Sequence, residues 1–270
     1  MIMGKKDDIV KKIERKIRRA ISKFHMYTPI DHIMLCVYPL PEGIVLAEYL
    51  TRIEREFPRS KLTILLPEIV SFNVEEHQQN VRIIKISEKV FSRVTKITEK
   101  ATKYNVPKGN LGLAVLLNEL QKFTKKIKAN KIALPLTADI EAYLAFEKVV
   151  YGRVPLLDMP LMVKINALAR ITLPMINVLN KDIHEFLSIR GSVYEELKLP
   201  IEEDIVQWID KLERRSPGII YGYLSNIERI MELKSEEIVV CENCGRPSLS
   251  KLCNECRIVK LVSSTMMSTG

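Results

Sequence analysis

Ile33-Met34-Leu35-Cys36-Val37-Tyr38-Pro39-Leu40-Pro41-Glu42-Gly43 is the stretch that best predicts the fold class. It leads into an amphipathic segment that ends at Glu56. Five consecutive apolar residues, 33–37, predict a strand buried on both faces, and apolar residues at helical spacing over 43–56 predict a helix. Similar short apolar runs predict strands at residues 62–66, 81–86 and 132–136. Apolar residues at helical spacing predict further helices at residues 88–104, 110–129 and 138–150.

Strands that alternate with helices of this length indicate βαβ units, which fold as a doubly wound, mostly parallel α/β sheet. A weaker strand candidate containing Pro174 follows Ile171, and helices are expected from about Lys181, Glu202 and Pro217 onward. In such a sheet, ligands bind in the crevice outside the carboxyl ends of the strands. The loop that follows the first strand is therefore the first place to look for a site.

Four of the five cysteines form two Cys-x-x-Cys pairs eight residues apart, namely Cys241, Cys244, Cys253 and Cys256. Two residues between paired cysteines let both sulfurs turn toward one point, and two pairs supply the tetrahedral coordination that zinc accepts. Because intracellular thiols are kept reduced, metal binding is favoured over disulfides. We expect a small zinc ribbon with a structural metal, since four thiolates leave no open position for water. The ligand set does not distinguish zinc from rubredoxin-like iron.

The formal net charge of +9 is concentrated in residues 1–24, which carry nine basic and three acidic side chains. Apolar residues at spacings of three and four predict an amphipathic helix with one docked face and one positive face. Its candidate nucleic-acid-binding residues are Lys11, Lys12, Arg15, Lys16, Arg18 and Arg19. A second basic cluster contains Lys122, Lys125, Lys126, Lys128 and Lys131. These residues are either solvated helix faces or, taken together, a surface for a polyanion such as RNA.

Three features carry a resemblance to a known family. They are the cysteine module with Gly-Arg-Pro-Ser at 245–248, the segment SPGIIYGYLSNIERIMEL at 216–233, and the basic helix that leads into the first strand. In these features the chain resembles the cytosolic tRNA 2-thiolation proteins of the PP-loop ATP-pyrophosphatase superfamily. The resemblance implies a PP-loop ATPase (HUP-like) fold, tRNA as substrate, and ATP-dependent sulfur transfer to a tRNA uridine.

The phosphate-binding loop of that family is replaced in this chain. In the family, the first strand ends in Ser-Gly-Gly-x-Asp-Ser, whose backbone N–H groups face the pyrophosphate of ATP. Here the matching residues are Tyr38, Pro39, Leu40, Pro41, Glu42 and Gly43. The two prolines have no N–H to donate, Leu40 adds a branched side chain, and Gly43 has no hydroxyl, although Glu42 could replace the aspartate. We therefore expect that this chain does not bind ATP.

Two other chemical elements of the family are also reduced. The stretch that matches the family's Thr-Gly-His-Asn-x-Asp-Asp runs over residues 134–140 and retains only Asp139, which we expect to serve as a first-turn helix residue. The family holds an iron–sulfur cluster or carries sulfur on cysteines in the middle of the chain, and no cysteine lies between Cys36 and Cys241. Cys36 lies in an apolar run and is expected in the core. We therefore expect no iron–sulfur cluster.

These observations predict a non-catalytic, cytoplasmic subunit of a tRNA uridine 2-thiolation complex. It would bind tRNA and stabilise an active PP-loop subunit as a heterodimer, with no membrane partner, because charges and prolines interrupt the apolar residues 154–179. Two alternatives remain: an active sulfurtransferase with a rebuilt site and an external sulfur carrier, and a zinc-ribbon RNA-binding or scaffold protein. The expected organisation is a basic helix (1–26), a degenerate PP-loop-like α/β domain (27–190), a helical appendage (191–236), a four-cysteine zinc ribbon (237–260) and a flexible tail (261–270).

Overall fold

The computed structural model describes residues 2–70, 80–87, 89–159, 168–191 and 197–267. The chain divides into two compact units, and each is formed by three separate segments. Unit 1 contains residues 1–86, 128–140 and 172–198, and unit 2 contains residues 87–127, 141–171 and 199–270.

The sheet has the strand order β3-β2-β1-β4-β5. Its strands are β1 (His32–Cys36), β2 (Lys61–Pro67), β3 (Val81–Ile86), β4 (Lys131–Ala133) and β5 (Arg170–Thr172). The β1–β2, β1–β4 and β2–β3 pairs are all parallel. The prediction of a doubly wound, mostly parallel α/β sheet is therefore confirmed. The chain order reverses between β1 and β4, which is the point where such sheets place their ligand crevice.

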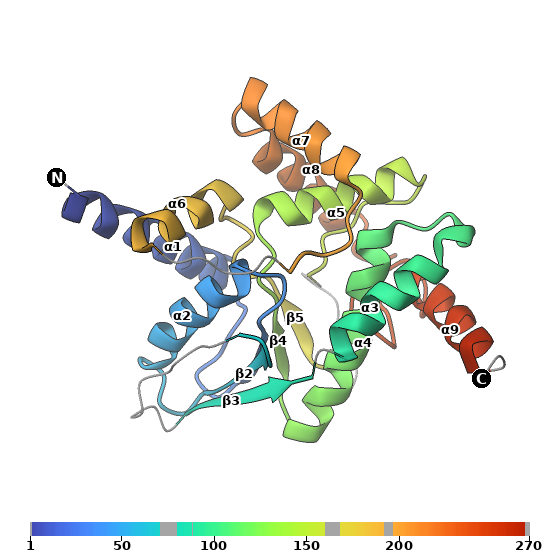
Figure 1. The fold of residues 1–270 in the computed structure, drawn as a ribbon, viewed down its shortest axis with the longest axis horizontal. Coiled ribbons are helices and arrows are strands. Elements are labelled where there is room, and N and C mark those ends of the chain that lie inside the picture. Colours follow the sequence, from blue (N-terminus) through green and yellow to red (C-terminus); the bar gives the residue numbers. More distant parts are fainter. Residues whose placement is uncertain (1, 71–79, 88, 160–167, 192–196, 268–270) are drawn as a thin grey trace. The chain divides into compact units, whose positions relative to one another are not determined.

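Three helices pack against one face of this sheet in unit 1: α1 (Ile2–Lys23), α2 (Glu42–Glu54) and α6 (Asn180–Arg190). Ile33, Leu35 and Val37 of the first strand and the residue after it belong to the same apolar cluster as side chains of these helices. Because side chains alternate along a strand, Met34 and Cys36 face the opposite side, and both are fully buried. Figure 1 shows α1 and α6 side by side, and the two helices are in contact.

Strand β4 is shorter than the predicted residues 132–136. It ends at Ala133, and the next N–H, that of Leu134, donates to the carbonyl of Thr172. Pro135 then has no N–H with which to continue a ladder. Helix α5 (Ala138–Val150) follows and has the predicted bounds.

Unit 2 is mainly helical. It contains α3 (Lys89–Lys100), a short 3₁₀ turn (Thr102–Tyr104), α4 (Lys108–Ile127), α7 (Glu203–Arg215), α8 (Ile219–Leu233) and α9 (Asn254–Met267). A two-residue antiparallel hairpin, β6 (Val239–Val240) with β7 (Pro247–Ser248), precedes α9. Helix α9 packs on α4 and α3. Trp208 of α7 stacks on Phe146 of α5 with ring centroids 4.7 Å apart. None of the helices within the described ranges is long and apolar enough to cross a membrane.

Candidate functional site

The loop 38–43 follows β1 at the switch point of the sheet and is buried. The Tyr38 hydroxyl donates to the carbonyl of Lys198 at 2.7 Å, and the Leu40 N–H donates to the carbonyl of Leu197 at 2.9 Å. The Gly43 N–H donates to the carbonyl of Pro39, in the first turn of α2. Residues 197–198 therefore pair with the loop, and the N–H groups of Leu40 and Gly43 are already used within the protein.

Gly43 is needed for packing rather than for a phosphate. A Cβ atom placed on it would lie 2.7 Å from the Cα of Val37 and 2.8 Å from its carbonyl carbon. Real Cβ atoms do not approach backbone so closely, so a glycine is required where α2 crosses the end of β1. The peptide bonds before Pro39 and Pro41 are both cis.

The stretch after β4 also has structural partners. The Thr137 hydroxyl accepts from the N–H of Ile140, and it lies 2.5 Å from the side-chain oxygen of Asn180. The Asp139 carboxylate accepts from the backbone N–H of Asn180 at 2.6 Å. Thr137 thus caps the start of α5, and Asp139 satisfies an N–H at the start of α6. Asp139 therefore binds the neighbouring helix α6, in addition to its expected position in the first turn of its own helix.

Cys36 is fully buried. Burial raises the pKa of its thiol to about 12. Since the thiolate is the nucleophilic form of cysteine, the protonated Cys36 thiol is inert at neutral pH.

Two of the basic residues predicted for nucleic acid hold α1 in place. Lys12 and Lys16 each lie 2.7 Å from a carboxylate oxygen of Asp182 on α6, whose side chain is 2% exposed. Burial alone would raise the pKa of Asp182, but the hydrogen bonds from these two lysines lower it below its ordinary value. These contacts leave Lys12 and Lys16 less suited to bind phosphates.

Arg18 also has protein partners, because it binds Glu14 and Glu56. Lys11, Arg15 and Arg19 are exposed. Of the six predicted residues, Lys11, Arg15 and Arg19 are the most exposed. The buried face of α1 consists of Ile9, Ile13, Ile17 and Ala20, whereas Ile21 and Phe24 are half-buried.

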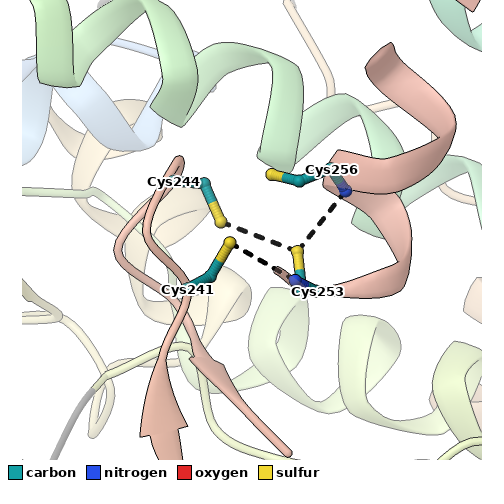
Figure 2. Close-up of side chains that lie close together, drawn as sticks. All are labelled: Cys241, Cys244, Cys253 and Cys256. Carbon is teal, nitrogen blue, oxygen red and sulfur yellow. Dashed lines mark hydrogen bonds between the residues drawn. The ribbon is translucent and has the colours of Figure 1, made fainter. Parts of the chain in front are cut away.

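The four cysteines near the C-terminus converge in unit 2. Their sulfur atoms all lie within 4.8 Å of one another, and all four residues are buried. Figure 2 shows Cys241 and Cys244 beside the β6–β7 hairpin, facing Cys253 and Cys256 where α9 begins. The backbone N–H of Cys253 points at the sulfur of Cys241, and that of Cys256 points at the sulfur of Cys253, both at 3.4 Å. The donor set is that of a metal centre.

Gly245 makes the first cysteine pair possible. Its φ of 80° is left-handed, and its N–H donates to the carbonyl of Cys241 at 3.0 Å. Glycine is the residue that adopts this conformation without steric cost. A Cβ there would also lie 2.7 Å from the side-chain nitrogen of Gln121. The Cys244-Gly245 step therefore closes the turn that aims both sulfurs at one point.

Ligand spacing gives a test of what the centre can hold. Four thiolates about 2.3 Å from one tetrahedral ion lie about 3.8 Å apart. The sulfurs of Cys244 and Cys253 are separated by 3.8 Å. Four thiolates are equally the donor set of an iron–sulfur cluster. The spacing in this structure therefore fits one tetrahedral ion, zinc or iron. A cluster of several irons has the same donor set and requires the two cysteine pairs to lie farther apart.

A buried ion network anchors the cysteine module within unit 2. Arg246 follows the first cysteine pair and is 2% exposed. Its guanidinium donates to the Asp158 carboxylate at 2.6 Å, and to the backbone carbonyl and side-chain oxygen of Asn110 at 2.8 and 2.6 Å. Lys148 donates to the same Asp158 oxygen at 3.2 Å. Burial would raise the pKa of Asp158, but the charges of Arg246 and Lys148 lower it.

Asn110 links this network to the start of α4. Its side-chain nitrogen donates to Glu147, and that carboxylate also accepts the backbone N–H groups of Gly109 and Asn110 at 3.0 and 2.9 Å. Glu147 thus supplies the acceptors for N–H groups that a helix start leaves without a partner. The position of the cysteine module is therefore set by side chains of α4, α5 and the segment around Asp158.

Sequence reasoning missed Arg246, Asp158 and Glu147. One signal was present, since Asp158 is a lone acid inside the apolar stretch Leu156-Leu157-Asp158-Met159. An acid in such a stretch needs a buried cation. The sequence does not say which of the 42 basic residues supplies it.

No protein-family model matches the sequence, and no curated protein matches it. Among solved structures, the chain is similar to the U34-tRNA thiolase NcsA from Methanococcus maripaludis with its [4Fe-4S] cluster. The TM-score is 0.64 and the identity 13%, and the alignment covers 95% of this chain and 89% of the thiolase chain.

The expectation of structural zinc without an iron–sulfur cluster is contradicted by this comparison. The thiolase carries a [4Fe-4S] cluster, and this chain has a group of four cysteines of the kind that binds iron as well as zinc. The sequence argument failed because paired Cys-x-x-Cys knuckles serve both metals, and it searched for cluster ligands only in the middle of the chain. At 13% identity the likeness establishes one thing: the chain has the α/β fold of this tRNA thiolase.

Proposed function

We propose that this protein is a tRNA-binding, non-catalytic subunit of a tRNA uridine 2-thiolation complex in the cytoplasm. The observation that carries the proposal is the loop at the switch point. In a fold shared with a U34-tRNA thiolase, the place where a phosphate loop would lie holds two prolines and the buried side chains of Tyr38 and Leu40. The Tyr38 hydroxyl and the Leu40 N–H are used in hydrogen bonds to residues 197–198, and the Gly43 N–H is used within the loop.

The partner in this proposal is an active PP-loop subunit that supplies ATP and sulfur chemistry. In such a complex this chain would provide a tRNA-binding surface and would stabilise its partner. Its positive charge is consistent with the first of these roles. The net charge is +9, and Lys11, Arg15 and Arg19 of α1 are exposed. Phosphate contacts from such residues give affinity without sequence specificity.

The four cysteines are assigned iron, bound as an iron–sulfur cluster. The thiolase with this fold carries such a cluster, and the donor set of Cys241, Cys244, Cys253 and Cys256 fits one. A bound cluster would supply one-electron redox chemistry. In the non-catalytic reading, its role is to hold the hairpin and the start of α9 together.

The same four cysteines favour a second candidate, an active sulfurtransferase with a rebuilt site. In that case the cluster would take part in sulfur transfer in place of the absent mid-chain cysteines, and ATP would bind elsewhere than in loop 38–43. The two candidates make opposite predictions for the purified chain, because only the enzyme needs ATP.

The test is calorimetric titration of the purified, iron-loaded chain with ATP and Mg²⁺, followed by a thiolation assay with tRNA, ATP and a sulfide source. We expect no ATP binding and no thiolated tRNA from the chain alone, and thiolated tRNA once the co-purified partner is added. Micromolar, Mg²⁺-dependent ATP affinity would contradict the non-catalytic proposal and support the active sulfurtransferase. Iron and acid-labile sulfide are measured in the same preparation, and their absence contradicts the cluster.

A further inference from the structure

A cavity of about 470 Å³ lies beside the cysteine module, and its described lining comes entirely from unit 2. Its walls are α3, α4, α9 and the two residues between Cys241 and Cys244. We call this cavity the α4–α9 groove. Its polar lining consists of Arg93, Asn118, Glu119, Gln121, Lys122, Lys125, Glu242, Asn243, Lys260, Ser263 and Ser264.

The groove has an excess of positive charge. Four cations and two carboxylates line it. One carboxylate, Glu119, is shared by two of the cations, because Arg93 and Lys122 both lie 2.9 Å from the same oxygen. The other two cations, Lys125 of α4 and Lys260 of α9, are exposed. Across the residues that the structure describes, neither has a carboxylate within ion-pair distance.

The remaining lining groups suit phosphate oxygens. The hydroxyl of Ser263 and the side-chain amides of Asn118 and Asn243 can donate hydrogen bonds, as such groups do to nucleic acid backbones. The apolar lining is Val115, Leu168 and Val259. No aromatic side chain is among the described lining residues, so nothing here would stack on an unpaired base. The chemistry therefore matches the backbone of a folded RNA rather than its bases.

One wall of the groove depends on the metal centre. Glu242 and Asn243 lie between the first two cysteines, and Asn118 places its side-chain oxygen 3.7 Å from the sulfur of Cys256. A metal that fixes the cysteines therefore also fixes this wall. Metal loading and the shape of the groove are linked.

We propose that the α4–α9 groove binds the phosphate backbone of tRNA, with Lys125 and Lys260 as its phosphate contacts. This inference rests on the proposed function, because it names the surface through which the subunit holds tRNA. It differs from the six candidate residues on α1. It includes Lys125 of the second basic cluster and adds Lys260, which the sequence did not single out.

The experiment measures binding of a fluorescein-labelled tRNA transcript to the metal-loaded full chain over a range of KCl concentrations. The test variant is K125E/K260E, and the matched control is K96E/K211E, which reverses two exposed lysines of unit 2 outside the groove. We expect K125E/K260E to bind at least about tenfold more weakly, with the slope of log K against log[salt] reduced by about 2. The control should lose less affinity although its net charge is the same. Circular dichroism confirms that both variants are folded.

The outcomes separate the groove from the function on which it rests. If wild type binds tRNA and both variants lose the same affinity for tRNA, the groove is not the binding site, although the proposed tRNA binding is still supported. If wild type binds no tRNA, the proposed function fails together with the groove. If K125E/K260E loses binding to polyglutamate but not to tRNA, the groove binds an acidic protein and the RNA assignment is wrong. Removal of the metal should weaken tRNA binding in wild type and have little further effect in K125E/K260E.

Discussion

Glu141 is a carboxyl group that the fold keeps out of water completely. One of its oxygens accepts the backbone N–H of Asp158 at 2.6 Å. Burial first, and then the negative charge of Asp158, raise its pKa to about 8, although Lys148 and Arg246 act in the opposite direction. Near pH 7 this network thus holds Arg246 and Lys148 against the Asp158 carboxylate, with Glu141 protonated beside them.

The buried proton on Glu141 predicts how stability depends on pH. The folded protein keeps this proton up to about pH 8, whereas the unfolded chain releases it near its ordinary value of 4.5. Stability from this group is therefore fully present below about pH 4.5 and is lost as pH rises through about 8. Glu141→Gln keeps a neutral side chain, so its unfolding free energy should fall less than that of wild type over this range.

Urea unfolding followed at several pH values measures this effect. Glu236→Gln is the control, since it removes an exposed carboxylate of unit 2. If Glu141→Gln and wild type show the same pH slope, Glu141 is ionised in the folded protein and the explanation fails.

The junction of β1 and α2 is the element boundary where this chain differs most from the family that its sequence resembles. In the family that the sequence resembles, the loop here is shaped to receive a pyrophosphate. In this chain the loop packs against another segment of the same chain. Leu40 forms a β-bridge with Leu197, and the Tyr38 hydroxyl donates to the carbonyl of Lys198. Gly43, which stands where the family's loop has a serine, is needed because α2 crosses the end of β1 closely.

Gly43→Ala tests whether this glycine serves packing. An alanine in a helix normally stabilises by roughly 0.5–1 kcal/mol relative to glycine. Here the new Cβ would meet the backbone of Val37 at 2.7 Å, and overpacking of this kind costs about 1–3 kcal/mol. We expect a net loss of unfolding free energy, measured by chemical denaturation.

The matched control is Gly222→Ala in α8, where a Cβ would meet nothing within 4 Å. This variant should be as stable as wild type or more stable. A Gly43→Ala protein that is also stabilised would mean that α2 can shift away from β1, contrary to the packing described above.

The two units of the chain are stabilised in different ways. Unit 1 has an apolar cluster formed by strands, α1, α2 and α6. Unit 2 contains the cysteine centre and the buried network around Arg246. Too few apolar residues lie between Cys241 and Cys256 to form a core of their own, so this segment depends on its metal.

Metal removal should therefore act locally. After chelation, or in Cys244→Ser, amide hydrogen exchange should accelerate in β6, β7 and the start of α9, while the amides of β1 and β2 keep their protection. Cys36→Ala is the control, because it truncates a buried side chain of unit 1 and should leave the metal content unchanged. Uniform loss of protection over the whole chain would contradict this local dependence.

The sequence could predict most of the sheet because the information is local. Buried parallel strands are short apolar runs, and α5 was placed at its observed bounds, since its apolar residues recur at helical spacing between clear boundaries. The end of β4 was misplaced by three residues, because residues 134–136 stay buried after they leave the ladder. Burial and strand pairing give the same apolar pattern, so the pattern cannot distinguish them.

The order of residues was enough to predict the α/β class, the four clustered thiols and a loop after the first strand that contains two prolines. Each follows from residue types at fixed spacing: alternating apolar runs, Cys-x-x-Cys pairs, and prolines that have no N–H. The folded chain was needed to show that Asp182 binds Lys12 and Lys16, that Arg246 pairs with Asp158, and that Lys125 and Lys260 line one groove. These partners lie between 88 and 170 residues apart in the sequence. Charges interact according to their distance in space, which the order of residues does not contain.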